Sequence, residues 1–208
     1  MGPPDAKTRD LLTRRLGLTG ADLDRLGAYL DLLEKWQARI NLVGPATLAR
    51  AWSRHVLDSA QLRPLIPPGA VVVDLGSGAG FPGLVLAALH DGPVHLVESD
   101  LRKGVFLAEA NRLLGGRAIL HNVRIEAADL PPADVVTARA LAPLDRLLAL
   151  ARPLLAPGGK CLFPKGARAD EELTACGKTW TMRHRRHASL SDADAAILEI
   201  EDFAPAHD

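Results

Sequence analysis

Residues 71–83 read VVVDLGSGAGFPG: a β-branched apolar run, an acidic residue, three alternating glycines and a Phe-Pro-Gly step. Glycines let the backbone turn sharply out of a strand and leave room beside it for a ligand. Pro82 suits the first turn of a helix, where no amide donor is needed. A helix that begins here points its free N–H groups into the same space. The pattern therefore predicts a strand, a binding turn for a nucleotide-like ligand, and a helix.

The glycine spacing by itself leaves the ligand open. Gly78, Gly80 and Gly83 satisfy the G-x-G-x-x-G pattern of dinucleotide-binding proteins, and a glycine-rich turn without a ligand is a further alternative. Asp74, two residues before Gly76, completes the Asp-x-Gly-x-Gly-x-Gly order that is typical of S-adenosylmethionine-dependent methyltransferases. A carboxylate here opposes a pyrophosphate, whereas a cationic sulfonium tolerates it. Asp74 and these glycines therefore favour S-adenosyl-L-methionine as the cofactor.

A second acidic residue, Glu98, follows the apolar run 94–97, about twenty residues after the glycines. A carboxylate at the end of the second strand accepts hydrogen bonds from ribose hydroxyls in either cofactor class. The alternative interpretation is a solvated strand end. Glu98 thus supports an adenosine-containing ligand without choosing between the cofactors.

Composition limits the architecture and the partners. A chain of 208 residues with 48% hydrophobic residues can bury one substantial core. Alternating strands and helices predict an α/β fold with a mostly parallel sheet covered on both faces. We expect an N-terminal helical extension over residues 1–66 and the core over residues 67–208. The 25 basic and 25 acidic residues of the whole chain balance, so any contact with nucleic acid must come from a local group of basic residues.

The expected elements follow from apolar periodicity and from turn residues. Helices are predicted over 21–40, 47–62 and 103–114 and from Pro82 and Pro143, and strands over 71–75, 94–98, 118–121, 135–138, 161–163 and 195–200. Cys161 and Cys176 are too few for a disulfide framework, which fits a reducing compartment. Without a signal region, a membrane-spanning run or a metal-ligand cluster, the expectation is a cytoplasmic protein that binds no metal or membrane.

Several motifs fall in a specific order along the chain. They are Asn41-Leu42, Arg54-His55-Val56-Leu57-Asp58-Ser59, the glycine loop, Glu98-Ser99, Arg102-Lys103, Arg124-Ile125-Glu126, Arg139-Ala140 and Lys165-Gly166. With these motifs the chain resembles the RsmG (GidB) family of bacterial 16S rRNA guanine-N7 methyltransferases from about residue 29 to residue 166. The resemblance implies a Rossmann-like methyltransferase fold and methyl transfer to N7 of guanine 527 in standard 16S rRNA numbering. It implies the small ribosomal subunit or its RNA as the partner.

The resemblance also implies cofactor contacts at Gly76, Phe81, Ile125, Glu126 and Arg139. Each is predicted beyond the carboxyl end of a strand, where ligands of open α/β sheets lie. The Arg139 fork suits the methionine carboxylate or the guanine O6, and an ordinary salt bridge is the alternative. We therefore expect Arg139 to act by positioning.

Methylation at guanine N7 places little demand on acid–base groups. N7 is an unprotonated lone pair at neutral pH, so in-line methyl transfer needs alignment and no general base. The candidates for holding RNA are Asn41, Arg54, His55 and Lys165. Among the alternatives, Asn41 caps a helix end, and His55 pairs with Asp58 three residues further along one helix.

Other functions remain open from the sequence. The densest basic segment, residues 183–187 (Arg-His-Arg-Arg-His), is either a phosphate-contacting patch or a solvated loop. A nicotinamide-dependent oxidoreductase fits the glycine spacing, although the only tyrosine is Tyr29 and no Tyr-x-x-x-Lys pair exists. A methyltransferase-like module that binds RNA without catalysis is a third class. A monomer is the expected oligomeric state.

Overall fold

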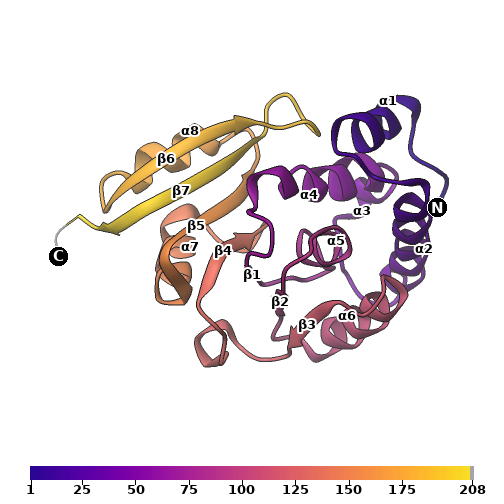
Figure 1. Ribbon diagram of the computed structural model, residues 1–208, viewed down its shortest axis with the longest axis horizontal. Coiled ribbons are helices and arrows are strands. Elements are labelled where there is room, and N and C mark those ends of the chain that lie inside the picture. Colours follow the sequence, from indigo (N-terminus) through magenta and orange to yellow (C-terminus); the bar gives the residue numbers. More distant parts are fainter. Residues whose placement is uncertain (207–208) are drawn as a thin grey trace.

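The computed structural model describes residues 1–206, within which seven strands form one sheet in the order β3-β2-β1-β4-β5-β7-β6 (Figure 1). The strands are β1 Val72–Leu75, β2 Val94–Val97, β3 Ala118–His121, β4 Ala133–Ala138, β5 Leu155–Lys165, β6 Trp180–Ala188 and β7 Ala196–Pro205. Strands β1 to β5 pair in parallel, whereas β7 is antiparallel to both β5 and β6. The predicted α/β class with a mostly parallel sheet is confirmed.

Strand β1 lies in the interior of the sheet, between β2 and β4, and all four of its residues are buried. It pairs with β2 through Val72↔Val94 and with β4 through Val72↔Val135. The chain order along the sheet reverses between β1 and β4. In open parallel sheets a crevice forms at such a reversal, outside the carboxyl ends of the strands. The topology therefore puts the ligand site beyond Leu75 and Ala138.

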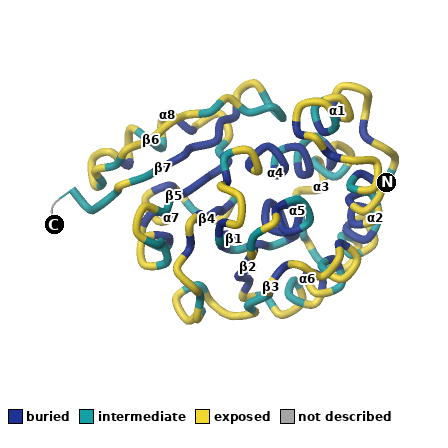
Figure 2. The backbone as a smooth tube through the Cα atoms, in the orientation of Figure 1, coloured by how far each residue is buried: buried dark blue, intermediate teal, exposed yellow. Residues whose placement is uncertain are grey.

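Helices cover both faces of the sheet (Figures 1 and 2). Helices α5 Gly83–Leu89 and α6 Leu101–Leu113 pack on one face with the N-terminal helices. Helices α7 Leu144–Ala151 and α8 Ala169–Cys176 pack on the other. Figure 2 shows buried residues along the middle of the sheet and exposed ones on the outer helix faces. The two apolar layers hold the strand ends in fixed positions.

The N-terminal part consists of short and long helical segments. They are α1 Ala6–Asp10, the π-helical η1 Leu11–Arg15, α2 Gly20–Gln37, α3 Pro45–Leu48, the π-helical η2 Trp52–Leu57, α4 Asp58–Ala60 and the 3-10 turn η3 Arg63–Leu65. Helix α2 begins with a capping box, in which Thr19 and Asp22 each bond the other's backbone N–H. Its buried leucines recur every three or four residues, as an amphipathic helix requires.

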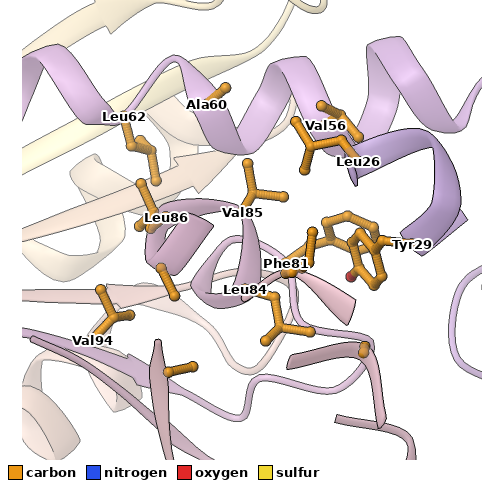
Figure 3. Packing of buried hydrophobic residues seen from close by; sticks show 14 of the residues in the cluster. Leu26, Tyr29, Val56, Ala60, Leu62, Phe81, Leu84, Val85, Leu86 and Val94 are labelled. Atoms are coloured by element: carbon orange, nitrogen blue, oxygen red, sulfur yellow. The ribbon is translucent and has the colours of Figure 1, made fainter. Parts of the chain in front are cut away.

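The N-terminal helices share one apolar core with the sheet (Figure 3). Leu26 and Tyr29 of α2 and Val56 of η2 lie against Phe81 and Val85 around the start of α5. The Tyr29 hydroxyl donates to the carbonyl of Ala79 in the glycine loop, and its ring lies 5.3 Å from that of Phe81. The predicted boundary between residues 66 and 67 thus separates the N-terminal helices from the part of the chain that contains the sheet. The two parts share one continuous apolar core. Residues 207–208 of the predicted core range lie outside the described residues.

The carboxyl-terminal region differs from the sequence-based expectation. Residues 183–187 belong to β6, an edge strand paired with β7, so of the two alternatives for this segment the loop is wrong. Helix α8 and the early part of β5 were not predicted either. Strand 118–121 was predicted correctly, and Cys161 is buried in β5 as expected. Within residues 1–206 no helix combines the length and apolar character needed to cross a bilayer.

Candidate functional site

A cavity of about 890 Å³ opens beyond the carboxyl ends of the parallel strands. Its walls come from the loops that follow β1, β2, β3, β4 and β5, and from the segment between α2 and α3. The lining includes residues 42–44, 76–79, 97–99, 123–126, 139–142 and 164–166. The topology therefore brings together side chains that are far apart in the sequence.

The glycine loop forms the floor of the cavity. Gly76, Gly78 and Gly80 have φ angles of +62°, +57° and +89°, which side-chain-bearing residues rarely adopt. A Cβ on Gly76 would lie 2.6 Å from Cδ1 of Leu141 in the loop after β4. Gly76 and Gly78 line the cavity, whereas Gly80 turns toward Leu84 of α5. The loop thus exposes backbone at the floor in a way that only glycine permits.

Asp74 lies beneath this loop and is fully buried. Its Oδ2 accepts a hydrogen bond from Gly83 N–H at 3.2 Å, and its Oδ1 accepts from the Thr137 hydroxyl at 2.9 Å. Burial raises the pKa of Asp74 to about 6, and hydrogen bonds from its neighbours limit that rise. Asp74 is not among the residues that line the cavity within residues 1–206. It holds the loop, the start of α5 and β4 together from below.

Glu98 lines the cavity at the end of β2. Its Oε2 accepts from the Gly78 N–H at 2.9 Å, and its Oε1 accepts from the Asp100 N–H at 2.8 Å. These bonds fix the carboxylate beside the glycine loop and leave lone pairs for a ligand, since each carboxylate oxygen can accept twice. Glu98 is therefore anchored at the cavity edge rather than simply solvated.

Ile125 and Glu126 lie in a 3-10 turn, η4 Ile125–Ala127, and both line the cavity. The Glu126 carboxylate is exposed and pairs with Arg146 at 3.0 Å. Ile125 packs at the margin of the apolar cluster under α7 and α8. Ile125 and Glu126 thus form part of the cavity wall after β3.

Arg139 follows β4 and lies across the cavity with several partners. Its Nη1 donates to the Arg54 carbonyl at 2.8 Å and to Asp58 Oδ2 at 3.2 Å, and its Nη2 donates to His55 Nδ1 at 3.0 Å. The guanidinium carbon lies 5.1 Å from the centre of the Phe81 ring, a cation–π distance. The pair with Asp58 is largely buried, unlike an ordinary surface salt bridge.

The hydrogen bonds of His55 define its tautomer. Arginine can only donate, so His55 Nδ1 accepts from Arg139, and Nε2–H donates to the Thr47 hydroxyl at 2.9 Å. Thr47 in turn donates to the Gly44 carbonyl. Burial first, and then the nearby Arg139 and Arg54 charges, lower the pKa of His55 to about 3. The neutral ring stacks on Phe81, with centroids 4.9 Å apart.

The other residues predicted to hold RNA have different surroundings. Arg54 and Lys165 line the cavity, and each is paired with an acid at 2.7 Å, Arg54 with Asp192 and Lys165 with Glu172. Asn41 is exposed beside the lining residues 42–44, and no hydrogen bond from its side chain caps α2. The alternative that His55 pairs with Asp58 is wrong, because both side chains bind Arg139.

Sequence reasoning missed several residues of this site. Glu172 of α8 accepts from Lys165 Nζ and from the Leu144 N–H, and so ties α8 to the end of β5 and to the start of α7. Thr47 and Leu141 also line the cavity. The only signal for Glu172 in the sequence is the acidic run 170–172. The remaining contacts join distant segments and have no local signature.

The basic segment 183–187 lies apart from the cavity and is largely neutralised. Arg183 pairs with Glu201 and Asp202, Arg186 with Asp170, and His187 with Glu199. None of these side chains lines the cavity within residues 1–206. No group of three or more potential metal ligands occurs in that range either.

The sheet order, with β7 antiparallel beside β5, and Asp74 before the glycine turn together define a Rossmann-like methyltransferase of the S-adenosylmethionine-dependent class. A TehB-like SAM-dependent methyltransferase from Corynebacterium glutamicum has a similar fold, with a TM-score of 0.56, 13% identity and coverage of 84% of this chain and 97% of that chain. This likeness concerns the fold alone. Membership of this class makes S-adenosylmethionine the cofactor and not a nicotinamide dinucleotide, a choice that the glycine spacing alone left open.

The family model for rRNA small subunit methyltransferase G matches residues 22–200, and the chain belongs to this GidB family. The ribosomal RNA small subunit methyltransferase G of Paramagnetospirillum magneticum is 55% identical over 205 residues, which cover 98% of this chain and 97% of the relative. That of Rhodospirillum centenum is 54% identical over 190 residues, with 91% and 88% coverage. The resemblance inferred from the motifs is confirmed.

Proposed function

We propose that the protein transfers a methyl group from S-adenosyl-L-methionine to N7 of a guanine in 16S rRNA, at the position that the family resemblance implies, guanine 527. The observation that carries the proposal is the cavity over the glycine floor, whose lining includes Glu98, Phe81 and Arg139. The non-catalytic alternative predicts the same cavity, so an activity measurement must separate them.

The residues present fit an adenosyl sulfonium ligand. A side chain on Gly76 would occupy space at the cavity floor and press against Leu141, so glycine keeps this space open for a ligand. Glu98 suits ribose hydroxyls, and Ile125 offers an apolar surface for the adenine. Glu126, or the backbone beside it, suits the edge of the base. Asp74 acts through the loop that it holds.

The chemistry requires alignment more than proton transfer. When bound, S-adenosylmethionine supplies an electrophilic methyl group on a positively charged sulfur. Phe81 and the neutral His55 give the cavity a stacked, partly dry wall against which a planar base can be held. Arg139 is fixed at this wall, where its free donors suit a carboxylate or the guanine O6. Alignment of two reactants in this way supplies much of a methyl-transfer rate.

The substrate side is proposed on chemistry and family together. Arg54 and Lys165 lie at the cavity and suit phosphates if their acidic partners are exchanged, and Asn41 and His55 suit base edges. With ribosomal RNA as substrate, the activity belongs in the cytoplasm and the protein's partner is the small subunit. A monomer is sufficient for a site built from one chain.

The test is methylation of small subunits that lack the modification. Subunits are incubated with the protein and a labelled methyl donor, the RNA is digested, and the labelled nucleotide is mapped and identified by mass. We expect one 7-methylguanosine. Arg139→Ala is the site-directed comparison, and titration with NAD checks the rejected cofactor. Binding of subunits and cofactor without any label transfer would support the non-catalytic alternative.

A further inference from the structure

Asp58 occupies the junction between Arg139 and the β6–β7 loop, which we define as residues 189–195. Its Oδ2 faces the Arg139 guanidinium at 3.2 Å. Its Oδ1 accepts from the Ser191 hydroxyl at 2.7 Å and from the Gln61 amide at 3.0 Å. Both Asp58 carboxylate oxygens therefore accept hydrogen bonds, Oδ2 from Arg139 and Oδ1 from Ser191 and Gln61.

The β6–β7 loop is tied to the same helix by further bonds. Gln61 Oε1 accepts from the Leu190 N–H at 2.6 Å, and Gln61 Nε2 donates to the Ser189 hydroxyl at 3.1 Å. Asp192 pairs with Arg54 at the other side of this contact. The β6–β7 loop thus binds both ends of the helical segment that runs from Arg54 to Gln61. Its bonds fix the direction in which Asp58 presents its second oxygen.

Arg139 needs such support because its guanidinium lies at the end of a long, flexible side chain. Groups that align reactants must stay within about half an ångström of the productive position. His55 fixes Nη2 and Asp58 fixes Nη1, from positions one helical turn apart. Only Asp58 supplies a negative charge, with 14% of its side chain exposed against 17% for Arg139. In this partly buried position the charge defines the orientation of the fork.

We propose that Asp58 is a positioning residue that orients the Arg139 guanidinium toward the cavity, and that the β6–β7 loop holds Asp58 in place through Ser191. This inference rests on the proposed role of Arg139 in the site. It assigns the carboxyl-terminal hairpin a part in methyl transfer, although Ala195 is the only one of its described residues that lines the cavity.

Asp58→Asn is the decisive variant. The amide keeps the shape and can still accept from Ser191, but its NH2 then faces the Arg139 N–H donors. We expect a loss of kcat/KM for subunit methylation on the order of tenfold or more. The double variant with Arg139→Ala is expected to be no worse than Arg139→Ala alone. Asp170→Asn, which removes the distant ion pair with Arg186, is the matched control and should match the wild type.

A second readout is independent of activity. The ¹⁵N resonance of His55 Nδ1 reports its hydrogen bond from Arg139, and Asp58→Asn should shift it whereas Asp170→Asn should not. Ser191→Ala should produce the same shift at smaller size, and it serves if Asp58→Asn fails to fold. The inference is overturned if Asp58→Asn leaves the resonance unchanged, or if the losses of the two single variants multiply in the double variant. A wild-type protein that methylates nothing would refute the proposed function instead.

Discussion

The buried charge of Asp74 makes a specific prediction about stability and pH. Burial raises its pKa from 3.8 to about 6. The folded protein therefore binds more protons than the unfolded chain between these two values, and stability from this group rises as pH falls. That contribution is fully present below pH 3.8 and is lost as pH rises through about 6. The perturbation is Asp74→Asn, which removes the titration and keeps the shape.

The magnitude follows from the shift. Two pKa units correspond to about 3 kcal/mol between the protonated and ionised limits. Between pH 8 and pH 5 the expected change is about 1.4 kcal/mol, because only part of the titration falls in that interval. The amide also loses one acceptor, for either Gly83 N–H or the Thr137 hydroxyl, at a cost of about 1 kcal/mol that does not depend on pH. The pH dependence therefore isolates the charge.

Urea denaturation followed by tryptophan fluorescence measures the free energy of unfolding of both proteins at pH 8, 7, 6 and 5. The wild type should gain about 1.4 kcal/mol relative to the variant over this range. Other groups, including His55 with its lowered pKa, are common to both proteins and cancel in the difference. A difference that stays constant with pH would falsify the conclusion that Asp74 is buried at a raised pKa.

Three further predictions concern the cavity. Gly76→Ala, at φ +62° and 2.6 Å from Leu141 Cδ1, should lower stability by about 1–3 kcal/mol and weaken cofactor binding; calorimetric titration with an unchanged Kd would contradict this. Glu98→Gln should raise the cofactor Kd about tenfold in the same titration, because one N–H in the loop loses its charged acceptor, with kcat nearly unchanged. Lys165→Met should lower the free energy of unfolding by about 1–3 kcal/mol, because it leaves Glu172 unpaired. In urea denaturation, addition of Glu172→Gln should recover part of that loss. A raised KM for subunits with unchanged stability would instead favour a direct contact between Lys165 and phosphate.

Local signals were enough to predict the strand, the glycine turn and the acidic residue that the structure places at the cavity. The glycine turn needs positive φ angles, and apolar β-branched runs mark buried parallel strands, so both features can be recognised in short segments. The position of Glu98 follows once the second strand is recognised. Strand β6 of the carboxyl-terminal hairpin was missed for the opposite reason, whereas β7 was predicted in part by the strand over 195–200. Its cationic strand β6 is compensated by Glu199 and Glu201 on β7 and by Asp170 on α8, charges that only the folded chain brings together.

The surroundings of Arg139 were also beyond sequence reasoning. His55 and Asp58 lie three residues apart on one helix, a spacing that favours a direct pair. Both are bound instead by a guanidinium more than 80 residues away in the chain. A tertiary partner with five donors satisfies two acceptors at once, which a local pair cannot do. Helical spacing therefore identified His55 and Asp58, but the alternative that it suggested, a direct pair between them, is wrong.

The proposed binding of RNA phosphates by Arg54 and Lys165 depends on their acidic partners. Arg54 and Lys165 are both paired at 2.7 Å, so a phosphate must replace a carboxylate at either residue. Asp192 is 40% exposed and Arg54 35%, whereas the Lys165 side chain is only 9% exposed. Screening makes exchange at the exposed pair inexpensive, while removal of a partner from a buried charge is costly. Arg54 is therefore the cation that we expect to bind a phosphate, and Lys165 the one that keeps its carboxylate and holds the wall.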